Sequence, residues 1–363
     1  MKIEDLKKES FTLEKKQAYS LDLALISLRL AIKAYFSTYK ANPTYLGIIN
    51  SKALHNTKAA DNHHTTDFCE ASTETIFHFQ HFAELSCKKI LRDVHPLLCD
   101  VAIKKPLVLY KLLKNESLTA DESQSVKSIE FSETLENLIV LINKKALIDH
   151  DKLSFIIEHK ETLKALNDLR NRISHRGLFI MRYKALDIFI GKYIFPFVIA
   201  MTDHCYPNST RNYWFPKKTA CSIDPIHEII TECNLTAPNH KKIALLKEMG
   251  RASYENPLEI EANTDKTVGL TFSELFNERT KKRAVQVANF EQTEGNRIKI
   301  KCPVCGMPTL IIYKETHCDD DDGTYFDYAY EAKCECCTFS IHYDVDIPDE
   351  YEKFGIENYW NDL

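Results

Sequence analysis

Apolar residues recur at helical spacing through the first 205 residues of the chain. Between positions 21 and 39 they lie three or four residues apart, and Asn42-Pro43 ends this pattern. The same spacing predicts further helices over the ranges 67–92, 132–148, 152–176 and 181–201. The last of these is the most apolar and is expected to form the core. Few strand patterns interrupt the region, which favours an up-and-down helical bundle.

The helix expected over 67–92 carries its own start signal. Asp67 is a suitable N-cap, and Glu70 follows three residues later, as in a variant of the capping box. One face of this helix would pack into the bundle. The candidate core residues on that face are Phe77, Phe82, Leu85 and Ile90.

After residue 205 the helical pattern becomes fragmented. Five prolines punctuate short helical patches at 226–233 and 241–249. A capping box at Thr271–Glu274 then precedes a helix that ends in the basic run 279–283. This region is therefore expected to be a helical connecting subdomain.

From residue 296 the apolar period changes to two. This alternation predicts strands over the ranges 297–301, 310–313, 324–332 and 339–347. The loop between the second and third strands holds the acidic run Asp319–Asp322 and ends in the hairpin pair Asp322-Gly323. We therefore expect a mainly α protein with three parts, which are a helical bundle (1–205), a connecting subdomain (206–295) and a small β-rich domain (296–363).

Composition and charge narrow the functional classes. The chain has 363 residues and a net charge of -5, so no global basic field indicates a nucleic-acid partner, and any such contact must be local. Only nine residues are glycine, and no glycine-rich phosphate loop occurs. The polar N-terminus resembles no signal peptide, which favours a cytoplasmic protein. The apolar stretch Leu186–Met201 contains Asp187, Lys192 and Pro196, so we expect a buried, kinked helix and no membrane partner.

The end of the helix expected over 152–176 carries the candidate chemistry. Arg170, Asn171 and His175 stand there in the pattern R-N-x-x-x-H, and Asn171 and His175, four positions apart, share one helical face. A histidine can exchange a proton with a ribose 2′-OH or a leaving 5′-oxygen, and an arginine can stabilise the charge that develops on phosphate. Gly177 offers a second interpretation, in which it ends the helix and the nearby cations complement the negative helix terminus.

This string resembles the signature of the HEPN superfamily (higher eukaryotes and prokaryotes nucleotide-binding domains), many of which are RNases. Arg170 and His175 match the fixed positions of the motif, and Asn171 matches the polar residue that often follows the arginine. The resemblance covers about residues 15–205. It implies a dimer in which the arginine and histidine of both subunits line one cleft, and cleavage that needs no metal. Many relatives are toxins or phage-defence effectors, and others only bind.

The resemblance identifies no carboxylate that assists the reaction. Glu74 and Glu84, on the preceding long helix, are candidates, and the alternative for each is a solvated charge on the helix face.

A second constellation lies in the β-rich part. Cys302 and Cys305 form one C-x-x-C pair, and Cys334 and Cys337 form another. Two such pairs separated by a β-hairpin predict a tetrahedral four-cysteine site of zinc-ribbon type, with one structural Zn²⁺ per chain. Four thiolates fill the coordination sphere and leave no open position for catalysis. Cys336 is an alternative to Cys337 that the spacing leaves open.

Three functional hypotheses follow. The first is a metal-independent endoribonuclease of HEPN type, such as a toxin or phage-defence effector, which cuts RNA at a homodimer cleft. It would leave 2′,3′-cyclic phosphate and 5′-OH ends. The second is a non-catalytic HEPN-like module that binds RNA or nucleotide, or builds a complex, with a structural zinc ribbon. The third is a zinc-ribbon regulator that binds nucleic acid and whose helices only dimerise. Whether a regulatory protein binds the chain stays open.

Overall fold

The computed structural model describes residues 22–40, 64–177, 179–207, 219–258, 272–318 and 324–342. Of these residues 63% are helical and 11% lie in strands, so the chain is mainly α with a small C-terminal sheet, as expected. Contacts divide the chain into two compact units. Unit 1 comprises 1–31, 76–178 and 197–209, and unit 2 comprises 32–75, 179–196 and 210–363. The three successive domains drawn from the sequence stay a prediction.

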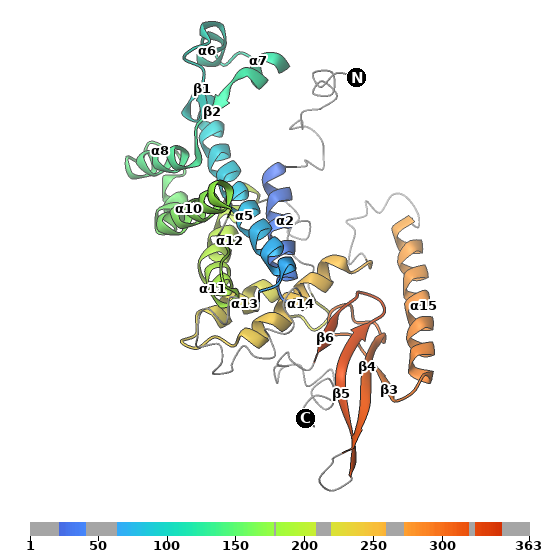
Figure 1. Cartoon of the computed structure of the whole chain (residues 1–363). Helices are drawn as coiled ribbons and strands as arrows, with labels where there is room; N and C mark the ends of the chain where they lie inside the picture. The colour runs from blue at the N-terminus through green and yellow to red at the C-terminus, as the bar shows by residue number, and fades with distance from the viewer. Residues whose placement is uncertain are drawn as a thin grey trace. The chain divides into compact units, whose positions relative to one another are not determined.

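Helices make up most of the described part of unit 1 (Figure 1). Three of them, α2, α5 and α12, also contribute residues to unit 2. A two-stranded antiparallel ladder joins β1 (Asp100–Val101) to β2 (Lys127–Ser128). The helices are α2 (Leu23–Ser37), α5 (Thr66–Val94), α6 (Pro106–Leu113), α7 (Ala120–Ser125), α8 (Phe131–Asn143), α9 (Ser154–Glu158), α10 (Lys160–Arg176) and α12 (Phe195–Cys205), with short 3-10 helices at Pro96–Leu98 and His150–Leu153.

The start of α5 differs from the expectation. Thr65, and not Asp67, caps the helix, because its Oγ1 accepts a hydrogen bond from the Phe68 amide at 3.2 Å. Its carbonyl also accepts a bond from the Cys69 amide at 3.1 Å. Asp67 instead lies in the first turn, where its negative charge complements the helix dipole.

The buried stripe of α5 is also shifted from the expected one. Phe82 and Ile90 are buried as expected, whereas Phe77 and Leu85 are only half-buried. Phe79 takes a place in the core that the sequence analysis did not assign. The stripe follows the i, i+3 spacing from Ile76 through Phe79 to Phe82, which leaves Phe77 at its margin.

Two other helices end or break earlier than expected. The helix α8 ends at Asn143 and not near residue 148, because Lys145 adopts a left-handed conformation with φ 55°. The amide of Ala146 then bonds back to the Leu141 carbonyl at 2.9 Å, which closes the helix end. The expected helix over 152–176 is divided at His159 into α9 and α10.

The most apolar helical run extends from Tyr183 to Cys205 and is irregular at its centre. It begins with α11 (Tyr183–Ile188), passes through a π-helical turn (Phe189–Ile194) and ends as α12. The turn ends two residues before Pro196, which has no amide hydrogen to donate. This run has 23 residues and is longer than the apolar stretch Leu186–Met201 marked in the sequence. By length and composition alone it could cross a membrane. Of its most apolar 18-residue window, 56% is buried, as in a core helix.

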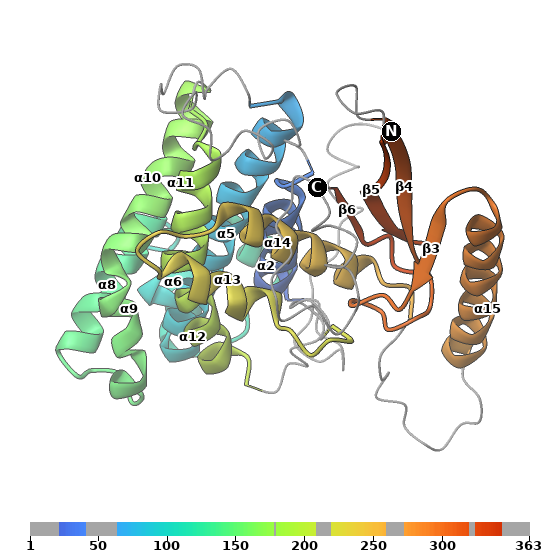
Figure 2. The ribbon, with the colours of Figure 1, turned by 90° about the horizontal axis from the view of Figure 1, so that it is seen from below.

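Unit 2 holds the small sheet and further helices (Figure 2). The sheet is an antiparallel meander in the order β3-β4-β5-β6. The predicted turn at Asp322-Gly323 and the acidic run before it lie outside the described residues, as does the end of the last predicted strand. The strands are β3 (Arg297–Ile300), β4 (Leu310–Cys318), β5 (Tyr325–Cys334) and β6 (Ser340–His342), and the helices are α13 (Pro225–Cys233), α14 (His240–Glu255) and α15 (Phe272–Thr293).

A buried ion pair joins α11 to α14 within unit 2. The carboxylate of Asp187 contacts the ammonium of Lys247, and both side chains are fully buried. His240 Nδ1 lies 3.1 Å from the second Asp187 oxygen, and Tyr35 donates a hydrogen bond to the first at 3.2 Å. Burial alone would raise the pKa of Asp187, but Lys247 and His240 outweigh it and hold this pKa below its usual value.

Breaking this pair should destabilise the protein strongly. Lys247→Met leaves Asp187 buried without its cation, and we expect a loss of about 3–5 kcal/mol in the free energy of unfolding. The double variant Asp187→Leu, Lys247→Met removes both charges and should recover much of that loss. Urea unfolding followed by circular dichroism measures both effects. A single variant within about 0.5 kcal/mol of wild type would contradict the assigned role.

Candidate functional site

The R-N-x-x-x-H motif lies in the last two turns of α10. The helix ends at Arg176, and Gly177 follows in a left-handed conformation with φ 63°, which glycine adopts at little cost. The Gly177 amide donates to the Ile173 carbonyl at 3.0 Å. The helix end is therefore well defined, and the backbone of the motif is held in a regular helix up to it.

Arg170 is held in place by two neighbours. Its guanidinium donates a hydrogen bond to Asn171 Oδ1 at 3.1 Å and lies over the Phe77 ring, 5.9 Å from the ring centroid. The side chain is half-buried, so part of its donor fork stays available to a phosphate. Asn171 thus orients the arginine, and Phe77, which was expected only in the core, does so as well.

A polar chain next to Phe77 fixes α5 against α10. Gln80 on α5 donates to Asn167 Oδ1 on α10 at 3.4 Å. Asn167 in turn donates to Ser132 Oγ on α8 at 3.2 Å. Because Gln80 and Asn167 lie one turn from Phe77 and Arg170, these bonds set the register in which Arg170 meets the aromatic ring. No local sequence pattern marks these contacts.

His175 occupies a different environment from Arg170. Its side chain is exposed, one residue before the helix ends. Arg172 and Arg176 are exposed on the same terminal turns. This histidine is accessible to a large ligand, as general acid–base chemistry on RNA requires.

Neither candidate carboxylate is brought to the motif by a described contact. Glu74 is exposed. Glu84 accepts hydrogen bonds from Lys88 at 2.6 Å and from Gln80 at 3.0 Å. Burial raises the pKa of Glu84, but these bonds outweigh it and leave the pKa below its usual value. Glu84 is thus an ionised partner of Lys88, with a role in helix packing.

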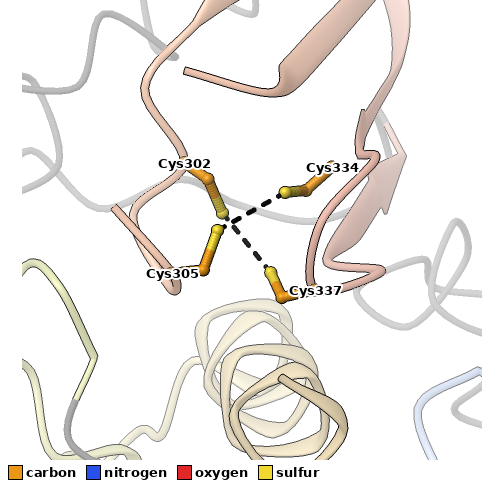
Figure 3. A group of neighbouring side chains, drawn as sticks. All are labelled: Cys302, Cys305, Cys334 and Cys337. Atoms are coloured by element: carbon orange, nitrogen blue, oxygen red, sulfur yellow. Dashed lines mark hydrogen bonds between the residues drawn. The ribbon is translucent and has the colours of Figure 1, made fainter. Parts of the chain in front are cut away.

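The four cysteines predicted as ligands lie together (Figure 3). The sulfur atoms of Cys302 and Cys337 are 3.6 Å apart, those of Cys305 and Cys334 are 3.7 Å apart, and all four fall within 4.8 Å of one another. A tetrahedron of sulfurs about 2.3 Å from a zinc ion has edges of about 3.8 Å. The cluster therefore has the size needed to hold a metal ion.

The first cysteine pair lies on a tight turn between β3 and β4. The Gly306 amide donates to the Cys302 carbonyl at 2.9 Å, and the Cys302 amide donates to the Met307 carbonyl at 2.8 Å. The Val304 amide points at the Cys302 sulfur from 3.4 Å. Gly306 has φ 76°, a left-handed conformation that glycine adopts at little cost.

The second pair repeats this turn between β5 and β6. The Thr338 amide donates to the Cys334 carbonyl at 3.1 Å, and the Cys334 amide donates to the Phe339 carbonyl at 2.7 Å. The Cys336 amide lies 3.4 Å from the Cys334 sulfur. Cys336 therefore occupies the position of Val304 in the first turn, and Cys337 that of Cys305. The repeat favours Cys337 over Cys336 as the fourth ligand.

The pKa values of two of the clustered thiols are shifted in opposite directions. Neighbouring thiols donate to Cys305 and hold its pKa below the usual value, whereas burial raises the pKa of Cys302. Four sulfurs this close cannot all carry charge without a cation among them. A bound divalent ion would supply that charge.

The second turn is braced by α14, a contact that the sequence did not indicate. Thr338 has φ 61°, which is unfavourable for a β-branched residue. Arg251 donates to the Thr338 carbonyl at 2.7 Å, and the Thr338 hydroxyl donates to Glu255 at 2.8 Å. The buried carboxylate of Glu248 accepts a bond from the Ser340 amide at 2.7 Å. The cysteine site is thus attached to a helix of unit 2.

The chain matches no protein-family model, no curated protein and no solved structure. The resemblance to the HEPN signature therefore rests on the residues of the motif.

Proposed function

We propose that the protein is a metal-independent endoribonuclease of HEPN type, with Arg170 and His175 as its catalytic residues. The observation that carries this proposal is the placement of the motif. Arg170 is oriented by Asn171 and Phe77, while His175 is exposed at the same helix end. The arginine would bind the scissile phosphate, and the histidine would move the proton of the ribose 2′-OH.

The reaction needs two proton transfers. The 2′-oxygen attacks the adjacent phosphorus and loses its proton, and the 5′-oxygen leaves and gains one. The products are a 2′,3′-cyclic phosphate and a 5′-OH end. We therefore expect purified protein to give these ends on RNA and to leave DNA of the same sequence intact. Cleavage should continue in EDTA at a concentration that leaves the metal of the cysteine cluster bound. Products with 3′-OH and 5′-phosphate ends would contradict the proposal.

Symmetry would supply a second histidine, so we expect a homodimer through the helical region with the two α10 helices near the twofold axis. A single exposed His175 would have to serve both proton transfers, whereas two His175 side chains in one cleft can serve as base and acid. Light scattering at micromolar concentration should give twice the chain mass of 42.0 kDa. A monomer that cleaves RNA at the full rate would rule out this arrangement.

The ion in the four-cysteine cluster is, in the same proposal, one structural Zn²⁺ per chain. Four thiolates are the ligand set of structural zinc sites, and they leave no position for substrate. The metal would fold the turns that dock on α14 and would take no part in RNA cleavage.

The geometry also supports a second candidate, a non-catalytic HEPN-like module. Gly177 closes α10, and His175 and Arg176 lie in the last turn, where cations complement the helix dipole. In such a module the motif would stabilise a helix end and the bundle would only bind RNA, nucleotide or a protein. Equal RNA cleavage by wild type and motif variants, or no cleavage by wild type, would favour it.

A further inference from the structure

Helix α15 has two faces of opposite character. Ala284 and Ala288 are buried, and the helix packs on β3 and β4 with them. At 100° per residue the opposite face carries a different set of side chains. These residues are all exposed, and they are Arg279, Lys282, Arg283, Gln286 and Phe290.

Contacts along one side hold α15 on the sheet. Glu291 forms an ion pair with Arg297 of β3 and accepts a hydrogen bond from Tyr313 of β4 at 3.5 Å. Lys299 of β3 donates to Asn289. Figures 1 and 2 both show α15 beside β3, with its outer side turned away from the strands. The exposed face is therefore presented on a fixed support.

The three cations on this face are exposed. Within the described part of the chain, Arg279, Lys282 and Arg283 form no ion pair or hydrogen bond, whereas the adjacent Lys281 pairs with Glu278 at 3.0 Å. The three positive charges repel one another, and the chain as a whole is negative, with a net charge of -5. A row of unneutralised cations on one helix face suits a polyanion with regularly spaced charges.

Phe290 gives this face a second property. Its ring is 63% exposed and lies on the same face as Arg279 and Arg283, opposite the buried alanines. Burial cannot explain an aromatic ring at this position. Exposed aromatic rings next to cations are the means by which proteins bind single strands, because every base has a face that can stack.

We propose that the face of α15 formed by Arg279, Lys282, Arg283, Gln286 and Phe290 binds single-stranded RNA. The cations would contact successive phosphates, and Phe290 would stack on one base. From Arg279 to Phe290 the helix rises about 16 Å, which is enough for more than one nucleotide. The choice of RNA over DNA rests on the proposed function, but binding at α15 does not require Arg170 or His175.

The test is binding of a fluorescent 12-nucleotide single-stranded RNA, measured by anisotropy with the full metal-loaded chain. All proteins carry His175→Ala so that the probe stays intact. The triple variant R279Q/K282Q/R283Q should raise Kd at least about tenfold at low salt and reduce the salt slope by about 2, since each phosphate contact contributes about 0.7. Phe290→Ala should raise Kd about fivefold or more with an unchanged slope, and Phe290→Trp should bind like the parent.

The matched control removes three exposed lysines of unit 1 in the variant K104Q/K114Q/K127Q, which should bind like the parent. The inference is overturned if the parent protein does not bind the RNA, if the α15 triple variant binds as tightly as the parent, or if the control loses as much. Equal binding of DNA of the same sequence would overturn the choice of RNA. Cleavage by wild type and His175→Ala tests the proposed function separately, since it is scored on product and not on binding.

Discussion

Replacing His175 with alanine should lower the rate of RNA cleavage by about 10²–10⁴-fold, the usual contribution of a general acid–base. Arg170→Ala should lower the cleavage rate by about 10²–10³-fold, because the charge that develops on the phosphate would lose its hydrogen-bond donor. These losses should appear in single-turnover rates at saturating RNA, where binding no longer limits the reaction.

Stability measurements separate this effect from unfolding. His175 is exposed, so its replacement should change the free energy of unfolding by less than about 0.5 kcal/mol. The matched control is Arg176→Ala, which removes an exposed cation from the same turn and should leave most of the cleavage rate. A His175→Ala protein that cuts at the wild-type rate would remove the catalytic role of the motif.

Removing the metal should unfold the β-rich region while most of the helical signal remains. Structural zinc sites contribute about 10–16 kcal/mol to folding, more than a typical domain has to spare. Elemental analysis should find one zinc per chain, and a strong chelator should abolish the chemical shifts of the sheet in NMR spectra. Protein purified without chelator that contains no zinc would contradict the metal assignment.

The repeated turns supply a sharp pair of variants for this test. Cys337→Ser removes a ligand and should prevent stoichiometric zinc binding. Cys336→Ser changes the adjacent thiol, whose backbone position corresponds to Val304, and should retain one zinc per chain. The opposite outcome would make Cys336 the ligand and show that the two turns are not equivalent in the bound state.

The cysteine cluster was predictable because its information is local. Each C-x-x-C pair sits on one turn, and the alternating strands around it indicate the hairpin that brings the pairs together. The choice between Cys336 and Cys337 depended on backbone hydrogen bonds that the spacing does not determine. The mainly α fold was likewise predictable from apolar periodicity, although the boundaries shifted where Thr65 capped a helix and Lys145 ended one.

Contacts between distant residues were not predictable from one sequence. Asp187 and Lys247 are sixty positions apart, and neither lies in a motif, yet they form a fully buried ion pair. Phe77 was expected on the core-facing side of its helix, and nothing near it in the sequence indicates the Arg170 guanidinium. Such contacts depend on how helices pack, which a periodic pattern constrains only by face.

The most direct test of the central claim is cleavage of one RNA by wild type and His175→Ala side by side. A matched substrate has a single 2′-deoxy nucleotide at the mapped cleavage position. We predict that wild type cuts the RNA but fails to cut the matched substrate at the deoxy position. His175→Ala should cut neither substrate at a rate comparable with that of wild type on the RNA. Cleavage of the deoxy position by wild type, or equal cleavage by both proteins, would contradict an endoribonuclease that uses the 2′-OH and His175.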